Sequence, residues 1–215
     1  KVGDFVIVPF THGCGHCPIC LAGFEANCPN AKDGVNGGYQ GEFYRAINAD
    51  GALVKIPGQP SDYSDDQLAS LTTLADVMPT GFHAAKAADV HEGDTVVVFG
   101  DGAVGLCAVI SAKLLGAKRI IAMSRHEDRA ALARDFGATD IIAERGKEAI
   151  QKIMSLTDGY GADAALECVG TKQAIESAFQ AVRAGGRVGR VGVPHDVDYN
   201  EWVDSLFWKN IQLGG

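Results

Sequence analysis

Four cysteines near the start of the chain have types and spacing suited to metal binding. They are Cys14, Cys17, Cys20 and Cys28, which gives the pattern Cys-x2-Cys-x2-Cys-x7-Cys. Such short spacings let one turn of backbone direct several sulfurs to one point, and four thiolates complete a tetrahedral zinc shell that leaves no position for substrate. The alternative is a set of free or disulfide-bonded cysteines, but a disulfide scaffold would be shorter and denser in cysteine. The pattern therefore predicts a structural zinc in a lobe at about residues 12–30.

A second motif, Gly100-x-Gly102-x-x-Gly105, has the spacing of a dinucleotide-binding loop. It follows an apolar run and precedes a helical pattern, which is the context that this motif requires. Gly100 would allow the tight turn, Gly102 would let a pyrophosphate approach the backbone, and Gly105 would let helix and strand pack closely. The helix that begins at Ala103 and Val104 would point its N-terminus at the pyrophosphate. The alternative is a glycine-rich turn that binds no nucleotide.

Two arginines after the next apolar run could determine which nicotinamide cofactor is bound. In a dinucleotide fold the end of this strand lies beside the adenosine ribose, where NAD enzymes place Asp or Glu. Here Met123 is followed by Ser124 and Arg125, and no acidic residue comes before Glu127. Ser124 and Arg125 can donate hydrogen bonds to a 2′-phosphate, and Arg129 could add positive charge. We therefore predict that NADP(H) is preferred over NAD(H); the alternative is that these arginines are solvated and either cofactor is tolerated.

The elements that would position these motifs change character along the chain. Before residue 64, short runs at 4–9, 37–44 and 51–57 predict an irregular β-rich region. Ser64-Asp-Asp-Gln67 has the pattern of a capping box, so a helix should begin there and stop before Pro79.

Strands and helices are then expected to alternate. The predicted strands are 95–100, 119–123, 140–143, 162–169, 187–193 and 210–213, and the first five are joined by helical stretches. Gly116, Gly137 and Gly185 are expected to end helices in the left-handed conformation. Thr171 should open the helix before the fifth strand. This alternation predicts an α/β fold with a doubly wound parallel sheet.

The composition narrows the class of protein. The chain has 215 residues, 47% hydrophobic and 21% charged, with a net charge of −8. It has no cluster of Lys and Arg for binding nucleic acid and no apolar run long enough to span a membrane. We expect a cytoplasmic protein that binds neither. The remaining cysteines, Cys107 and Cys168, lie in apolar stretches and are interpreted as small core residues. Both ends of the chain are expected to be truncated.

The arrangement of these pieces resembles the zinc-dependent medium-chain alcohol dehydrogenase family over essentially the whole chain. The cysteine lobe is similar to its structural-zinc lobe, and Gly100–Gly105 is similar to its cofactor loop. The segment Asp76-Val-Met-Pro-Thr80-Gly-Phe-His83 is similar to the segment that joins the two domains of the family. The resemblance implies part of a GroES-like catalytic domain at 1–77 and a Rossmann domain at 78–215.

The resemblance also implies roles for individual residues. Asp76 would be the third ligand of a catalytic zinc, as in a bacterial-type subgroup of the family, while the usual Cys and His ligands precede the structural lobe and are absent here. Thr80 would touch the nicotinamide, and Val169 would line the adenosine site. The backbone that would pair with the carboxamide belongs to Val191, Gly192 and Val193. Without the resemblance, Asp76 would be a solvated carboxylate, Thr80 a helix cap and the valines ordinary strand residues.

The implied activity is hydride transfer between an alcohol, or its aldehyde or ketone, and NADP(H), with zinc activating the alcohol oxygen. The fragment alone is expected to be inactive, and the intact enzyme is expected to be a homodimer or homotetramer. Two alternatives stay open at this point. One is a non-catalytic or quinone-type NADPH-binding member of the superfamily, and the other is a zinc-knuckle interaction module.

Overall fold

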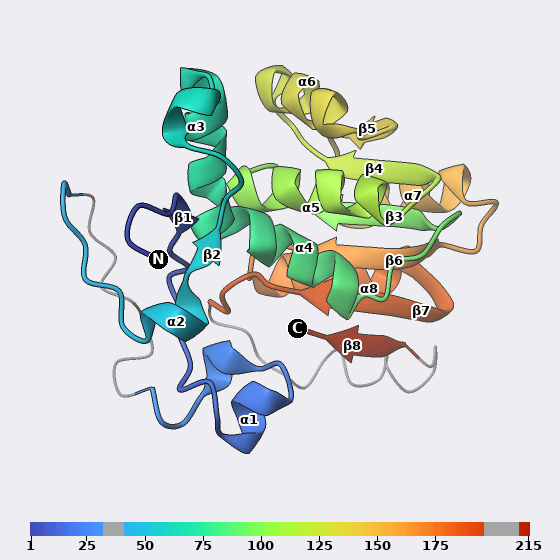
Figure 1. Cartoon of the computed structure of the whole chain (residues 1–215). Coiled ribbons are helices and arrows are strands. Elements are labelled where there is room, and N and C mark those ends of the chain that lie inside the picture. Colours follow the sequence, from blue (N-terminus) through green and yellow to red (C-terminus); the bar gives the residue numbers. More distant parts are fainter. Residues whose placement is uncertain (32–40, 196–210) are drawn as a thin grey trace. The chain divides into compact units, whose positions relative to one another are not determined.

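The computed structural model describes residues 1–31, 41–195 and 211–215 (Figure 1). The chain forms two compact units, Lys1–Asp76 and Val77–Gly215. Within the described ranges, no helix has the length and apolar character needed to cross a membrane.

The first unit is irregular, as predicted, but it contains less β-structure than the sequence pattern indicates. Its described residues contain one pair of strands, β1 (Val6–Ile7) and β2 (Val54–Lys55), which run antiparallel. Residues 41–44, the described part of the strand expected at 37–44, are not in a strand, and 37–40 lie outside the described residues. The start of the strand expected at 51–57 belongs instead to α2 (Ala49–Ala52). Asn48 precedes this helix in the left-handed conformation, with φ 51°, and turns the chain into it.

The remaining elements of the first unit are short helices. They are α1 (Pro18–Leu21), η1 (Glu25–Asn27), η2 (Pro60–Asp62), α3 (Asp65–Leu71) and η3 (Thr72–Ala75). The predicted capping box opens α3: Ser64 Oγ accepts from the N–H of Gln67 at 3.3 Å, and Gln67 Oε1 accepts from the N–H of Ser64 at 2.9 Å.

Pro79 does not act as the stop signal that the sequence suggested. Helix α3 ends at Leu71, well before the proline. A new helix, α4 (Val77–Ala87), begins two residues before Pro79. In the first turn of a helix the backbone N–H has no partner within the helix, so proline is tolerated there.

The second unit contains the predicted parallel sheet. Its strands are β3 (Thr95–Phe99), β4 (Arg119–Met123), β5 (Asp140–Ile142), β6 (Ala162–Glu167), β7 (Val182–Arg190) and β8 (Gln212–Gly214). They lie in the order β5-β4-β3-β6-β7-β8, and all neighbours are parallel (Figure 1). Counted from β3, this is the 3-2-1-4-5-6 order of a dinucleotide-binding Rossmann sheet. The predicted fold class is therefore confirmed.

Helices cover both faces of this sheet. Along β3, Val96 and Val98 pack into a core with α4, α5 (Ala103–Leu114) and α6 (Glu127–Phe136). Val97 and Phe99 point to the other face and pack with α7 (Gly146–Leu156) and α8 (Lys172–Ala181). Alternation of side chains along a strand explains why consecutive valines serve two cores.

The end of α8 differs from the prediction. Gly116 and Gly137 follow α5 and α6 with φ of 90° and 120°, as expected for glycines that end helices. Gly185 also has a positive φ, 68°, but it lies inside β7 and not at a helix end. Strand β7 begins directly after α8, and the pairing register between β6 and β7 shifts across this segment. Gly185 therefore accommodates an irregularity of the strand. The strand also ends at Arg190, earlier than the predicted 193.

Candidate functional site

The cysteine lobe in the first unit is built from two short turns. Cys17 is the N-cap of α1, and its Sγ accepts from the N–H of Cys20 at 3.5 Å. Pro18 occupies the first turn, where no N–H is needed. Cys28 follows the 3-10 turn η1 directly. These turns fold the chain back on itself and bring the later sulfurs to Cys14.

The four sulfurs lie at the separations that a zinc ion requires. The Sγ–Sγ distances are 3.5 Å for Cys17–Cys20, 3.8 Å for Cys17–Cys28 and 4.0 Å for Cys14–Cys20. A tetrahedral shell with Zn–S bonds near 2.3 Å has sulfurs about 3.8 Å apart. In the part of the chain that the structure describes, this is the one group of three or more His, Cys, Asp or Glu side chains arranged to bind a metal. The donor set fits a structural zinc.

The surroundings of these sulfurs favour thiolates at some positions and oppose them at others. The N–H of Cys14 donates to Cys28 Sγ at 3.3 Å, and Asn30 donates to Cys14 Sγ at 3.6 Å. Hydrogen bonds led by the backbone of His16 lower the pKa of Cys14 to about 5, whereas burial raises the pKa of Cys20 to about 12. Four thiolates this close repel one another unless a cation compensates their charge, and a divalent metal supplies that charge.

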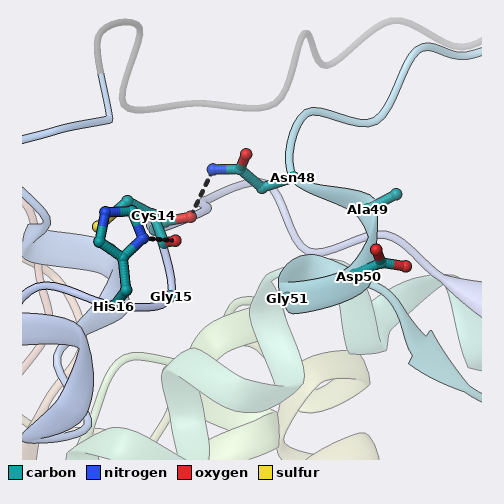
Figure 2. A pocket seen from close by; sticks show the side chains of 8 residues that line it. Cys14, Gly15, His16, Asn48, Ala49, Asp50 and Gly51 are labelled. Atoms are coloured by element: carbon teal, nitrogen blue, oxygen red, sulfur yellow. Dashed lines mark hydrogen bonds between the residues drawn. The ribbon is translucent and has the colours of Figure 1, made fainter.

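A pocket of about 430 Å³ beside Cys14 is lined by residues 13–16 and 48–51 (Figure 2). Two of its polar side chains contact backbone: Asn48 donates to the carbonyl oxygen of Gly13 at 2.7 Å, and His16 Nδ1 lies 2.7 Å from the carbonyl oxygen of Cys14. His16 does not belong to the group of side chains arranged to bind a metal. The hydrogen bond from Asn48 joins the lobe to the turn before α2.

Asp76 and Thr80 fall on either side of the division between the units. Asp76 is exposed and follows η3, with its N–H directed to the carbonyl oxygen of Thr73 at 3.3 Å. Thr80 is half-buried in α4. Over residues 1–31, 41–195 and 211–215, Asp76 is not gathered with two other metal-binding side chains.

In the second unit the glycine loop has a distinct geometry at each of its three glycines. Gly100 has φ 120°, a conformation that favours glycine. A Cβ at Gly105 would lie 2.1 Å from the carbonyl oxygen of Gly100, so helix α5 and strand β3 approach too closely for a side chain. A Cβ at Gly102 would meet no atom within 4 Å. The loop is thus closed against its own fold at Gly105 and open to a ligand at Gly102, as a pyrophosphate site requires.

A pocket of about 220 Å³ lies beside this loop at the carboxyl ends of the strands. This is the edge where open α/β sheets bind ligands. It brings together three residues selected from the sequence, Gly100, Arg125 and Val169. The other residues of its wall are Phe99, Asp101, Met123, Arg145, Gly146, Ala149, Thr171, Gln173, Ala174 and Ser177.

Asp101 is a charged residue of this pocket that sequence reasoning missed. Its carboxylate accepts from Ser124 Oγ at 2.8 Å and from Arg129 Nη1 at 3.1 Å. Burial opposes its ionisation, but these two hydrogen bonds outweigh burial and hold the pKa of Asp101 below its ordinary value. Two of the residues expected to bind a 2′-phosphate, Ser124 and Arg129, are therefore bound to a carboxylate. The available signal was the position of Asp101 inside the glycine motif, which places it beside the end of β4.

Two segments expected to contact the cofactor, at Val169 and at residues 191–193, are held side by side by a buried carboxylate. Glu167 is fully buried, and its Oε1 accepts from the N–H groups of Val169 and Gly170, each at 2.7 Å. Its backbone carbonyl accepts from the N–H groups of residues 191–192 at 2.9 and 3.1 Å. A Cβ at Gly170 would lie 1.9 Å from the carbonyl oxygen of Val193. Glu167 and Gly170 thus fix the end of β6 against the end of β7.

Comparisons with known proteins agree with both units. A family model described as zinc-binding dehydrogenase matches residues 103–214. The zinc-type alcohol dehydrogenase B of Aspergillus flavus is 36% identical to the chain, over 98% of the chain and 50% of that relative. The NADP-dependent isopropanol dehydrogenase of Thermoanaerobacter brockii is 39% identical, over 93% of the chain and 54% of that relative. The chain spans about half the length of these curated relatives.

Solved structures show the same similarity. The alcohol dehydrogenase TADH from Thermus sp. ATN1 matches with a TM-score of 0.86 and 31% identity, over 99% of this chain and 63% of that one. A zinc-dependent alcohol dehydrogenase from Streptococcus pneumonia matches with a TM-score of 0.84 and 30% identity, over 99% and 60%. With the sulfur group, the Rossmann sheet and the family model in agreement, the chain belongs to the zinc-dependent medium-chain alcohol dehydrogenase family.

Proposed function

We propose that this protein is a zinc-dependent oxidoreductase that transfers a hydride between an alcohol, or the corresponding aldehyde or ketone, and NADP(H). The observation that carries the proposal is a four-sulfur metal group and a dinucleotide loop open at Gly102 in one chain. The names of the relatives, zinc-type alcohol dehydrogenase and NADP-dependent isopropanol dehydrogenase, support the same reaction.

The chain's own residues would bind and orient the reacting groups. Bound zinc supplies a Lewis acid for the alcohol oxygen, and bound NADP supplies the hydride acceptor. Asp76 would provide one oxygen ligand to the catalytic metal, and Thr80 would contact the nicotinamide. The backbone at residues 191–193 would pair with the carboxamide. Val169 would form one wall of the adenosine pocket, the name used below for the pocket of about 220 Å³ beside the glycine loop, where we place the adenosine. Turnover is expected only when the remaining metal ligands are present, so the 215-residue chain alone should bind cofactor without turnover.

The preference for NADP(H) is supported by the charge at the end of β4. Arg125 lines the adenosine pocket, and no described carboxylate lies within ion-pair distance of it. The carboxylate of the pocket wall, Asp101, is already bound by Arg129 and Ser124. A guanidinium with free N–H groups is suited to a 2′-phosphate, which carries about −1.5 to −2 charges near neutral pH.

Calorimetric titration of the chain with NADPH and NADH tests this preference. The wild type should bind NADPH more tightly, and Arg125→Ala should weaken NADPH about 10- to 100-fold while leaving NADH nearly unchanged. Ser124→Asp should weaken NADPH by charge repulsion. Equal binding of the two cofactors by the wild type would contradict the proposed preference. Formation of NADPH from primary and secondary alcohols by the full-length protein, abolished by chelation, tests the reaction itself.

A cytoplasmic location and a dimeric or tetrameric assembly remain predictions. Size-exclusion chromatography with light scattering would measure the assembly directly.

A further inference from the structure

A second arginine lies at the adenosine pocket on a different element from Arg125. Arg125 lies two residues after the end of β4, and Arg145 lies between the end of β5 and the start of α7. Strands β4 and β5 are parallel neighbours at the edge of the sheet (Figure 1). Both arginines therefore follow the same end of adjacent strands. Both side chains line the same pocket, together with Gly100 and Asp101.

The backbone of its own loop holds the guanidinium of Arg145. Its Nη1 donates to the carbonyl oxygens of Ala143 at 3.3 Å and Glu144 at 2.9 Å. No other described residue hydrogen-bonds or ion-pairs with this side chain. Burial and the positive charge of Arg125 both lower the pKa of Arg145. Two cations therefore face one small pocket and repel each other, and an anion placed between them would relieve this repulsion.

The other charged groups nearby are already paired. Asp101 binds Arg129 at 3.1 Å, so the cation that the sequence suggested as an additional phosphate ligand is partly neutralised. Glu144 pairs with Lys152 at 2.5 Å, and Glu127 pairs with Arg134 at 2.8 Å. After these pairings, the unbalanced charge of the pocket wall is positive and belongs to Arg125 and Arg145.

We propose that Arg145 is a second specificity-determining residue, which binds the 2′-phosphate of NADP(H) together with Arg125. This inference rests on the proposed preference for NADP(H) and adds a residue to it. A 2′-phosphate presents three acceptor oxygens, and two guanidinium groups from neighbouring strand ends can bind different oxygens at once. NADH lacks this phosphate and presents only ribose hydroxyls, so it gains little from the second arginine.

Calorimetric titrations of NADPH and NADH with four forms of the chain test this role. The forms are the wild type, Arg145→Ala, Arg145→Lys and Arg134→Ala. Arg145→Ala should weaken NADPH about tenfold, the effect of losing one charge-assisted hydrogen bond, and change NADH less than about twofold. Arg145→Lys keeps the positive charge but lacks the planar guanidinium, so its affinity for NADPH should lie between those of the wild type and Arg145→Ala. Arg134→Ala removes the same charge from an exposed pair outside the pocket wall and should leave both affinities unchanged.

The titrations also separate the two ways in which the inference can fail. Wild type that binds NADPH and NADH equally overturns the proposed preference, and this inference with it. If the wild type prefers NADPH and Arg145→Ala keeps the same preference, only the proposed role of Arg145 is overturned. If Arg145→Ala weakened the binding of NADPH and NADH equally, Arg145 would serve to hold the loop in its fold and would not recognise the phosphate. The side chain of Arg145 makes no capping hydrogen bond to α7, so the variant is expected to fold, which thermal unfolding can verify.

Discussion

The cysteine lobe and the pocket beside the glycine loop are assembled in opposite ways. All four sulfurs of the lobe come from one continuous segment, Cys14 to Cys28, and two short turns bring them together. The pocket takes its wall from segments that range from Phe99 to Ser177 and lie at or after the ends of four different strands. A local site depends on a few backbone turns, whereas the distributed site depends on the register and order of the whole sheet. A substitution in the cysteine lobe should therefore affect the lobe alone, whereas a substitution that disturbs the sheet should affect the whole pocket.

The largest expected effect is the loss of zinc from the cysteine lobe. Cys17→Ser together with Cys20→Ser removes two of four ligands, and structural zinc contributes about 10–16 kcal/mol of binding free energy in small zinc domains. We expect elemental analysis to find about one tightly held zinc fewer per chain than in the wild type.

The same variant tests whether the lobe is energetically local. NADPH affinity should be retained, because the dinucleotide sheet lies in the other compact unit. Retention of the zinc would refute the four-sulfur assignment, and loss of NADPH binding would show that the lobe supports more than its own unit.

The next effect separates folding from binding within the glycine loop. Gly105→Ala places a methyl group 2.1 Å from the carbonyl oxygen of Gly100 and should lower the free energy of unfolding by about 1–3 kcal/mol. Gly102→Ala is the matched control, because its methyl group meets no atom within 4 Å and its φ of −86° suits alanine. Its stability should change by less than about 1 kcal/mol.

Gly102→Ala, which should have little effect on stability, should instead weaken cofactor binding. A methyl group there occupies the space that a pyrophosphate would approach, so NADPH and NADH should weaken together. Chemical denaturation and calorimetry measure the two properties independently. If Gly102→Ala binds both cofactors as tightly as the wild type, the loop does not receive the pyrophosphate.

The contrast between the two sites also explains what could be predicted from the sequence. The spacing of the cysteines and of Gly100, Gly102 and Gly105 encodes local geometry, and the structure shows that geometry at each position. The apolar runs predicted the sheet because buried parallel strands are apolar on both faces. Positions that depend on pairing were harder: Gly185 belongs to an irregular strand, although its type suggested a helix end.

The charge balance of the pocket could not be predicted from any single segment of the sequence. The sequence after β4 has no carboxylate before Glu127, yet Asp101 reaches Ser124 from the glycine loop, with a separation of 23 residues. Arg145 was missed for the same reason, because its proximity to Arg125 follows from the pairing of β4 with β5. Spacing within a segment cannot predict a contact that only the sheet creates.

The smallest expected effect tests this distributed charge balance through Asp101→Asn. The amide keeps the shape of the side chain but removes its negative charge, which frees Arg129 and Ser124 from a carboxylate. Less negative charge near the 2′-phosphate should tighten NADPH by about two- to fivefold, the size of a partly exposed charge interaction. NADH, which lacks the phosphate, should not gain. The ratio of the two dissociation constants, measured by calorimetry, should therefore move further toward NADPH.

Stability gives a second measurement on the same variant, and its dependence on pH has a defined sign. The pKa of Asp101 is held below its ordinary value, so the folded state favours the ionised carboxylate. That contribution is complete above the unfolded pKa of about 4 and is lost as pH falls through the lower folded pKa. The wild type should exceed Asp101→Asn by at most about 1 kcal/mol at neutral pH, and the difference should disappear in acid. If the NADPH preference instead falls in the variant, Asp101 holds Ser124 and Arg129 in place for the phosphate. The carboxylate would then support the specificity of the pocket, and its charge would not oppose the phosphate.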